Sequence, residues 1–382
     1  MKILHTSDWH LGKKLFRLER ILEHQLFLDW VIETLNKERI DVLLIAGDIF
    51  DTPTPPHHAL EMFYNFLHRL SQETKTFCYI IAGNHDSGLL LDAPSKLLQL
   101  HRIKVWGRLS SHSNDHWIEI SAGEESFDLC AIPFFRSYEL IPNGEGDILD
   151  ALKKYILREK TKPQLLLLHH LAGSFEATGS EQVISLSGVD SIPSELLQSF
   201  NYVALGHIHK PQKISRNAYY SGSPIPMRFS ETHKKSIRLL ELCNGEITSQ
   251  EILLPEWRKL HILKTNLQDW RNDIRRLDQQ SPLTPVIEIQ LELDEPIAGL
   301  IDEIKNELKE KGIELLSFIP TYRKMEVPTQ KKQKLFELSL PEIFEEFYLH
   351  KYPATSEIPS EVKLDFIELI QKAKNAPHQI KD

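Results

Sequence analysis

Five short motifs before residue 210 are rich in histidine, aspartate and asparagine, whose side chains are metal ligands. In chain order they are DWH (8–10), GDIFD (47–51), GNHD (83–86), HHL (169–171) and GHIH (206–209). Each motif alone is a weak signal, because an aspartate after a glycine is common in turns. Each of the five follows an apolar run, however, and their joint occurrence is difficult to explain by chance. The pattern predicts one shared polar site.

These residue types suit two divalent cations that act on a phosphodiester. Two such cations about 3.5–4 Å apart can hold the substrate and activate water between them, and a carboxylate must bridge them. Asp48 is the best candidate for the bridge, because Gly47 before it allows a tight turn. Mixed imidazole and oxygen ligands favour manganese, iron or zinc over calcium. One site would then contain Asp8, His10 and His209, and the other Asn84, His207 and either His169 or His170.

The fourth motif leaves a choice open, since successive residues of a strand face opposite ways and only one of His169 and His170 can readily be a ligand. In the third motif, we expect His85 to bind the phosphate and protonate the departing alkoxide, with Asp86 orienting its ring as a hydrogen-bond acceptor. The alternative is that His85 only packs beside the metals.

The elements that must position these motifs read as strands alternating with helices or loops. Strands are expected at 2–6, 41–46, 77–82, 127–132, 164–168 and 202–205. Residues 20–38 have the apolar spacing of an amphipathic helix. Shorter strands at 218–220 and 236–241 favour a second sheet packed on the first. The order predicts an α/β fold of two sheets flanked by helices, with a catalytic domain that spans residues 1–255.

The pattern of expected strands and helices changes after Pro255. Strands at 261–265, 286–293 and 314–319, with a helix at 297–311, predict a small α+β domain over residues 256–325. Residues 326–382 then form a linker and C-terminal segment, because 321–334 is polar and basic. An amphipathic stretch at 339–352 and a helix at 360–374 have too little core to fold alone. This tail is expected either to dock on the main body or to bind a partner.

Composition favours a soluble globular protein. The chain of 382 residues is 41% hydrophobic and has no apolar run long enough for a membrane span or a secretory signal, so a cytoplasmic location without membrane contact is expected. Its net charge of −9 argues against electrostatic binding of nucleic acid along the whole chain. Any DNA contact is therefore local or shared with a partner. The basic run after the first motif is either such a contact or a solvated surface, and it contains Lys13, Lys14, Arg17 and Arg20.

The motifs resemble those of the calcineurin-like metallophosphoesterase superfamily, and their wider context resembles the SbcD nuclease family. The similarity covers nearly the whole chain and is carried by KILHTSDWHLG, GDIFDTPTPP, AGNHDS, YVALGHIHKPQ and YYSGSPIPMRFSE. It implies a manganese-dependent nuclease with a catalytic His85. The family's fourth motif is a histidine followed by leucine, which matches His170 and Leu171 and favours His170 over His169. The implied ligands are Asp8, His10, Asp48, Asn84, His170, His207 and His209.

The resemblance also implies partners and an activity. Members form homodimers, act with a coiled-coil ATPase of the SbcC type, degrade double-stranded DNA ends from 3′ to 5′, and cut single strands and hairpins in repair and recombination. Residues from about 257 to 323 resemble a capping domain that positions DNA, and the C-terminal segment resembles the ATPase-binding region. Some members carry a second catalytic histidine where Asp51 stands here, so that role is not carried over.

Two alternatives compete with a nuclease. The first is a phosphatase or cyclic-nucleotide phosphodiesterase that uses the same metal cage on small phosphoesters, although such an enzyme would not need the residues beyond Pro255. The second is a scaffold without enzymatic activity. A scaffold predicts loss of some ligands, whereas every expected ligand is present.

Overall fold

The structure is a computed structural model. It describes residues 1–141, 143–144, 146–179, 181 and 191–322, together with single residues of the C-terminal segment. The latter are Phe344, Phe347, Tyr348, Ile358, Pro359, Val362, Lys363 and Phe366.

Two six-stranded sheets form the core of the described part of the chain. The first has the order β14 (Glu246–Leu253), β13 (Ser236–Cys243), β1 (Lys2–Thr6), β4 (Val42–Ala46), β5 (Phe77–Ile81) and β6 (Ile103–Trp106). The second has the order β11 (Gln212–Lys213), β12 (Ala218–Tyr220), β10 (Tyr202–Gly206), β9 (Gln164–His169), β8 (Glu125–Ile132) and β7 (Trp117–Ala122). The inner strands of each sheet run parallel.

Parallel strands place their carboxyl ends at one edge of a sheet, which is where open α/β sheets hold their sites. The predicted motifs directly follow β1, β4, β5, β9 and β10. The topology therefore brings the ends of five separate strands, drawn from both sheets, to a common edge.

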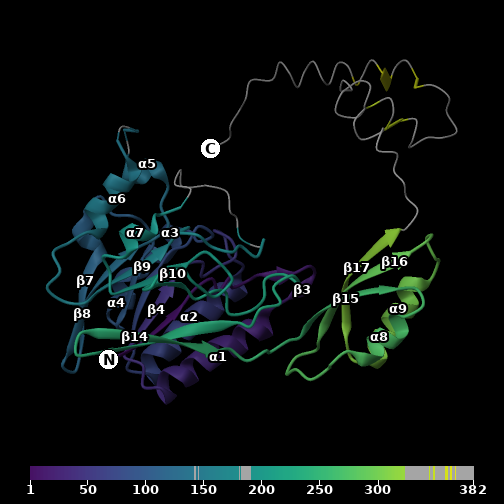
Figure 1. Ribbon diagram of the computed structural model, residues 1–382, viewed down its shortest axis with the longest axis horizontal. Helices are drawn as coiled ribbons and strands as arrows, with labels where there is room; N and C mark the ends of the chain where they lie inside the picture. Colours follow the sequence, from purple (N-terminus) through teal and green to yellow (C-terminus); the bar gives the residue numbers. More distant parts are fainter. Residues whose placement is uncertain are drawn as a thin grey trace. The chain divides into compact units, whose positions relative to one another are not determined.

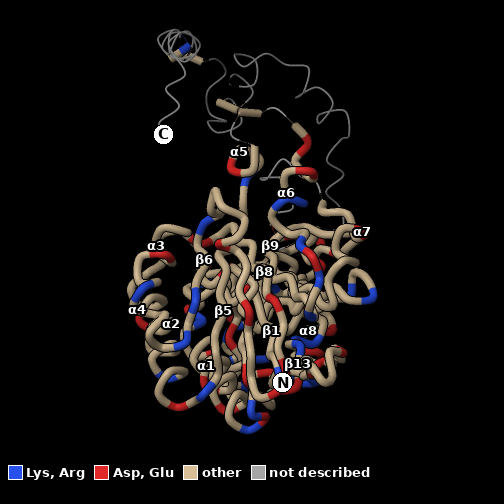
Figure 2. Tube along the Cα trace, turned by 90° about the vertical axis from the view of Figure 1, so that its left-hand side faces the viewer, with Lys and Arg blue, Asp and Glu red and all other residues tan. Residues whose placement is uncertain are grey.

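Helices cover the outer faces of the two sheets, as Figure 2 shows with α1 to α4 on one side and α6 and α7 on the other. On the first sheet lie α1 (Ile21–Lys37), α2 (His57–Glu73), α3 (Gly88–Asp92) and α4 (Ser95–Gln99). Beside the second lie α5 (Ser137–Leu140), α6 (Ile148–Ile156) and α7 (Ser194–Leu197). Phe27, Val31 and Leu35 of α1 pack on the first sheet, at the four-residue spacing of one helix face.

Between the sheets lies a second apolar layer. It is formed by residues such as Val42 and Leu44 from the first sheet and Leu165 and Leu167 from the second. Leu166 and Leu168, the alternate residues of β9, pack instead against the outer helices. Both faces of β9 are thus buried, as expected for a strand of a parallel sheet covered on both sides.

A smaller sheet follows, with the order β15 (Leu260–Asn266), β16 (Val286–Leu293) and β17 (Glu314–Tyr322) (Figure 1). The helices α8 (Trp270–Arg276) and α9 (Leu300–Glu310) accompany it. Alternate residues of β16 are buried, and Trp270 and Ile304 supply core from the helices. Just before this sheet, the Trp257 ring packs edge-on against Phe27, with 6.1 Å between ring centroids.

The chain divides into two compact units, one of residues 1–292 with 296–321 and the other of 293–295 with 322–382. The second unit includes a stacked pair of rings, Phe344 and Phe366. The division of the chain at residues 255 and 325 stays a proposal.

The strands expected from sequence match observed strands within two residues at each end, except that β17 extends three residues beyond the expected 314–319, and the expected helix at 20–38 is α1. The prediction missed the short β2 (Lys14–Leu15) and β3 (Leu18–Glu19) hairpin and the edge strands β6, β7, β11 and β14. The linker and helix expected after residue 323 lie outside the continuously described residues. Among the described residues, no helix has the length and apolar character needed to cross a membrane.

Candidate metal centre

Three clusters of ligand-type side chains lie at the carboxyl ends of the inner strands, and one of them, His10 with Asp51 and His85, shares His10 with another. Asp8, His10 and His209 form the first, and Asp48, His169 and His207 form the second; within each cluster the candidate ligand atoms lie within 4.8 Å of one another. All six side chains are buried. We call the first set site 1 and the second, together with Asn84, site 2.

Asp48 lies between the two sites. Its Oδ2 is 3.5 Å from His10 Nε2 of site 1, and its Oδ1 is 3.5 Å from His169 Nε2 of site 2. Each carboxylate oxygen thus faces a different set of ligands, which is the arrangement that a bridging carboxylate requires.

Asn84 joins site 2 through its side-chain oxygen. Its Oδ1 is 3.1 Å from His169 Nε2 and 2.8 Å from His207 Nδ1. His169 donates its Nδ1 proton to the carbonyl of Ala46 over 2.7 Å, so its Nε2 lone pair faces the two acceptor oxygens of Asn84 and Asp48. A proton or a cation must lie between these acceptors, since lone pairs facing one another repel.

In site 1, as in site 2, ligand-type atoms face one another at close range. Nε2 of His10 and Nε2 of His209 lie 3.1 Å apart, with their rings nearly perpendicular. Asp8 lies beside them and accepts a hydrogen bond from the backbone N–H of His207 over 2.9 Å, which ties the end of β1 to the end of β10.

The structure differs from the expected choice of His170, which it does not bring into either site. His170 faces away from both sites, accepts a 3.4 Å hydrogen bond from Phe135 N–H, and packs its ring against Phe134 and Phe135. His169 takes the position in site 2 instead. The reason is the alternation of β9, because residues 165, 167 and 169 face the first sheet whereas 166, 168 and 170 face the outer helices.

The contacts of Asp86 differ from the expected hydrogen bond to the ring of His85. Its carboxylate accepts three backbone N–H bonds, from Gly83 over 2.8 Å, Phe50 over 2.9 Å and Ile49 over 3.1 Å. It therefore holds the loops after β4 and β5 together. The ring of His85 is oriented by a different group, because His85 Nδ1 donates to the carbonyl of Asp51 over 2.8 Å. The ring of His85 lies beside site 1, with its centroid 4.9 Å from that of His10.

Several of the ligand residues adopt a backbone conformation that side chains rarely take. Asp8, His10, Asp48 and His207 all have positive φ, between 47° and 101°. Such conformations cost roughly 1–3 kcal/mol each and persist where the surrounding structure fixes them, typically at functional sites. Backbone strain at four residues of the metal centre supports a functional rather than a structural reason for these conformations.

The glycines of the third and fifth motifs allow the loops to approach closely. A Cβ on Gly83 would collide with the backbone and carboxylate of Asp48, and one on Gly206 would collide with the carbonyl of Ala46. Any larger residue at either position would push the loops apart. The glycines therefore set the distances between Asp48, Asn84 and the histidines.

The electrostatics of the site suit bound cations. Asp8 and Asp48 are almost fully buried, and within the described residues neither forms an ion pair with lysine or arginine. Burial raises the pKa of Asp8 to about 6. Burial lowers the pKa of His169, but the neighbouring Asp48 and Asp8 outweigh it and raise that pKa to about 9. A cation is thus favoured beside Asp48, and the donor set fits divalent metal ions.

Two charged side chains near the histidines were not identified as part of the site from sequence. Asp51 Oδ1 is 3.4 Å from His10 Nδ1, and Glu231 Oε1 is 3.6 Å from His209 Nδ1. Asp51 belongs to the GDIFD motif, so its spacing was a usable signal. Glu231 lies in a loop beyond β12, and it is the last residue of the YYSGSPIPMRFSE run that carries the family resemblance.

Comparison with known proteins places the chain in a family. Residues 1–211 match the model of the calcineurin-like phosphoesterases, and residues 256–352 match that of the type 5 capsule protein repressor C-terminal domain. The SbcD component of the nuclease SbcCD from Escherichia coli K12 is 30% identical over 370 residues, which cover 90% of this chain and 92% of that protein. The chain belongs to the SbcD family of calcineurin-like phosphoesterases. The SbcD relative from Bacillus subtilis is 34% identical over 68% of this chain and 71% of its own.

Membership of the SbcD family establishes a phosphoester hydrolase fold and implies divalent metal ions. The residues of sites 1 and 2 are those that would hold them.

Proposed function

We propose that the chain is a metal-dependent DNA nuclease that hydrolyses phosphodiester bonds at a pair of divalent cations, with manganese as the working metal. The observation that carries the proposal is the position of Asp48, whose two oxygens each lie 3.5 Å from a histidine of a different ligand set. Site 1 would contain Asp8, His10, Asp48 and His209, and site 2 would contain Asp48, Asn84, His169 and His207.

Two bound cations would supply an activated water and neutralise charge on the phosphate. The two carboxylates Asp8 and Asp48 offset only half of four positive charges, so an anionic substrate is still attracted. His85 supplies the proton for the leaving oxygen. Its Nδ1 is committed to the carbonyl of Asp51, which leaves Nε2 as the nitrogen that exchanges a proton.

Replacing His85 with alanine is expected to separate metal binding from cleavage. The variant should still bind two manganese ions, because the ligand sets proposed for sites 1 and 2 do not include His85, while kcat falls about 10²–10⁴-fold through loss of general acid catalysis. The measurement is metal content together with cleavage of labelled hairpin DNA. His101→Ala, a change at an exposed histidine, serves as the control and should leave both unchanged. Full activity of the His85 variant would remove the proton-donor role.

DNA is the proposed substrate because the similar proteins from Escherichia coli and Bacillus subtilis are both named as parts of a nuclease. With manganese, the purified chain should digest duplex ends from 3′ to 5′ and cut single strands and hairpins. Its activity on aryl phosphate monoesters should be low. A preference for the monoesters over DNA would instead favour a small-molecule phosphatase.

Of the basic run after the first motif, Lys14 and Arg17 are exposed and suited to contact phosphates. Arg20 is unsuited, because it is buried and bonds Glu23 and the carbonyl of Pro226. We further propose a coiled-coil ATPase of the SbcC type as the partner. The tail proposed to bind it lies mostly outside the described residues.

A homodimer is proposed to form through α3 and α4. Three leucines there are more than 60% exposed, namely Leu89, Leu97 and Leu100, and the two helices are neighbours in Figure 2. Exposed apolar groups gathered in one place are typical of an interface.

The double variant Leu97→Asp with Leu100→Asp is expected to turn a dimer into a monomer, since charges at an apolar interface lose their hydration. Light scattering after size-exclusion chromatography measures the change. Leu22→Asp on α1, where the leucine is equally exposed, is the matched control. If that control alone dissociated the dimer, α1 rather than α3 and α4 would form the interface.

A further inference from the structure

Both histidines of site 1 have a carboxylate behind the ring, and each carboxylate is paired with a lysine. Behind His10, Asp51 Oδ1 lies 3.4 Å from Nδ1 and 2.9 Å from Lys13 Nζ. His10 Nδ1 has no hydrogen bond of normal length within the described residues. Behind His209, Glu231 Oε1 lies 3.6 Å from Nδ1, and Glu231 Oε2 is 2.5 Å from Lys235 Nζ.

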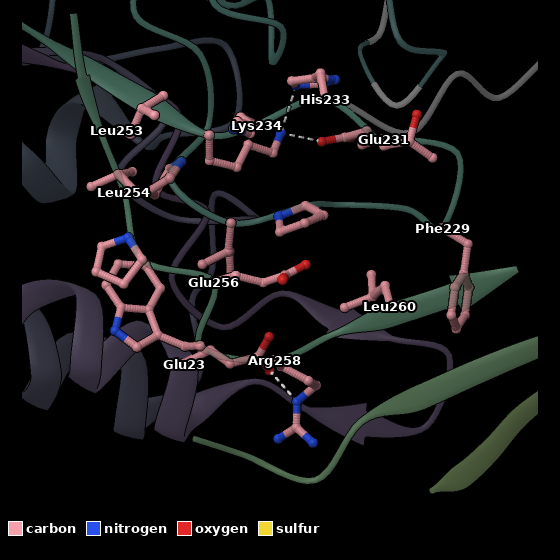
Figure 3. A pocket seen from close by; sticks show the side chains of 17 residues that line it. Glu23, Phe229, Glu231, His233, Lys234, Leu253, Leu254, Glu256, Arg258 and Leu260 are labelled. Carbon is pink, nitrogen blue, oxygen red and sulfur yellow. Dashed lines mark hydrogen bonds and ion pairs between the residues drawn. The ribbon is translucent and has the colours of Figure 1, made fainter. Parts of the chain in front are cut away.

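The support behind His209 is buried and extensive. The side chains of Glu231 and Lys235 are almost completely excluded from solvent. Lys235 also donates to Ser223 Oγ over 2.8 Å and to the carbonyl of His209 over 3.3 Å, so the lysine holds both the carboxylate and the backbone of the ligand. Glu231, labelled in Figure 3, is one of the residues that line a neighbouring cavity of 460 Å³.

Among the residues that the structure describes, no lysine-paired carboxylate stands behind the histidines of site 2. The outward nitrogen of His169 donates to a neutral group, the carbonyl of Ala46. For His207, none of the ion pairs found in the described part of the chain involves its ring. The two sites therefore differ in the charge behind their imidazoles, although their ligand atoms are similar.

A carboxylate behind an imidazole fixes the proton on the outward nitrogen, orients the ring and raises the basicity of the inward nitrogen. The ring-to-carboxylate distances of 3.4 Å and 3.6 Å exceed a normal hydrogen bond by a few tenths of an ångström, and a small rotation of each ring closes them.

We propose that Asp51 and Glu231 are positioning residues that make site 1 the tighter of the two metal sites, so that it fills first and site 2 fills second. This inference rests on the ligand sets given under the proposed function. Its consequence is a range of manganese concentrations in which the protein holds one ion and is inactive, and activity then follows occupancy of site 2.

The test is titration of the metal-free full chain with manganese by calorimetry. The wild type should bind two ions with clearly different affinities. Glu231→Gln and Asp51→Asn should each weaken the tighter site about 10–100-fold and the weaker site much less, because changes to the groups that orient metal ligands have that effect. At saturating manganese kcat should recover, whereas the manganese concentration for half-maximal activity should rise. Equal weakening of both sites, or no weakening, would overturn the inference.

Two control variants test whether loss of a lysine-paired carboxylate at any position weakens manganese binding. Glu119→Gln and Asp150→Asn also remove the charge of a lysine-paired carboxylate, but at exposed positions, and should leave both affinities unchanged. Glu231→Gln leaves Lys235 buried without its counter-ion and requires a thermal unfolding check. Asp51 is partly exposed, so Asp51→Asn decides the question if the other variant fails to fold. Failure of the wild type to bind two ions would count against the proposed function itself.

Discussion

Asp48→Asn is expected to lower the number of bound manganese ions from two to at most one and to abolish cleavage. The amide keeps the shape of the side chain and can still accept the 2.9 Å hydrogen bond from His85 N–H. What it loses is the negative charge that faces both sites. Metal stabilisation of a transition state is worth several kcal/mol, and each 1.4 kcal/mol is tenfold in rate, so activity should fall about 10³-fold or more.

Metal content by elemental analysis after gel filtration and cleavage of labelled DNA measure the two effects. Asp150→Asn removes a carboxylate at an exposed position and controls for loss of charge in general. Two bound ions in the Asp48 variant would contradict the bridging role, whatever the activity.

His169→Ala and His170→Ala are expected to have opposite consequences although the residues are adjacent. The first removes a ring that lies 3.1 Å from Asn84 Oδ1 and 3.5 Å from Asp48, so it should empty site 2 and reduce cleavage about 10³-fold. The second removes a ring packed on Phe134 and Phe135. It should destabilise the fold by about 1–3 kcal/mol while both ions stay bound.

Each variant is the control for the other, because both remove a buried histidine from the same strand end. Calorimetric titration with manganese and thermal unfolding of the metal-free proteins give the two readouts. Loss of metal from the His170 variant, with the His169 variant intact, would reinstate the assignment made from sequence.

The sequence alone could not decide between these two histidines, and the reason is physical. Alternation reveals the inner face of a strand only when one face is polar, but β9 is leucine at positions 165, 166, 167 and 168. Both of its faces are buried, one against the other sheet and one against helices. The His-Leu pattern of the family favours His170, whereas the structure places His169 in site 2.

Most strands that carry the site were predictable, because each is a short apolar run that ends in a polar motif. Their convergence was predictable too, since parallel strands share a carboxyl edge. The contacts of Asp86 were not. Its partners Ile49 and Phe50 are backbone donors in a loop after another strand, and no side-chain pattern marks them.

Glu231 illustrates a second limit. Its contact with His209 arises because the loop after β12 folds back over the end of β10, and the lysine that holds it stands four residues later. A glutamate and a lysine at that spacing are usual on protein surfaces, and the YYSGSPIPMRFSE run that ends at Glu231 does not show that the pair is buried beside His209. Asp51, by contrast, stands three residues from Asp48 in a motif already assigned to metal binding.

The proposed hydrolysis requires a pair of cations, one on either side of Asp48. Anomalous diffraction from a crystal of the full chain grown with manganese measures this most directly. We predict two manganese peaks about 3.5–4 Å apart. One should lie among Asp8, His10 and His209 and the other among Asn84, His169 and His207. A single peak, or peaks away from the Asp48 carboxylate, would contradict the account.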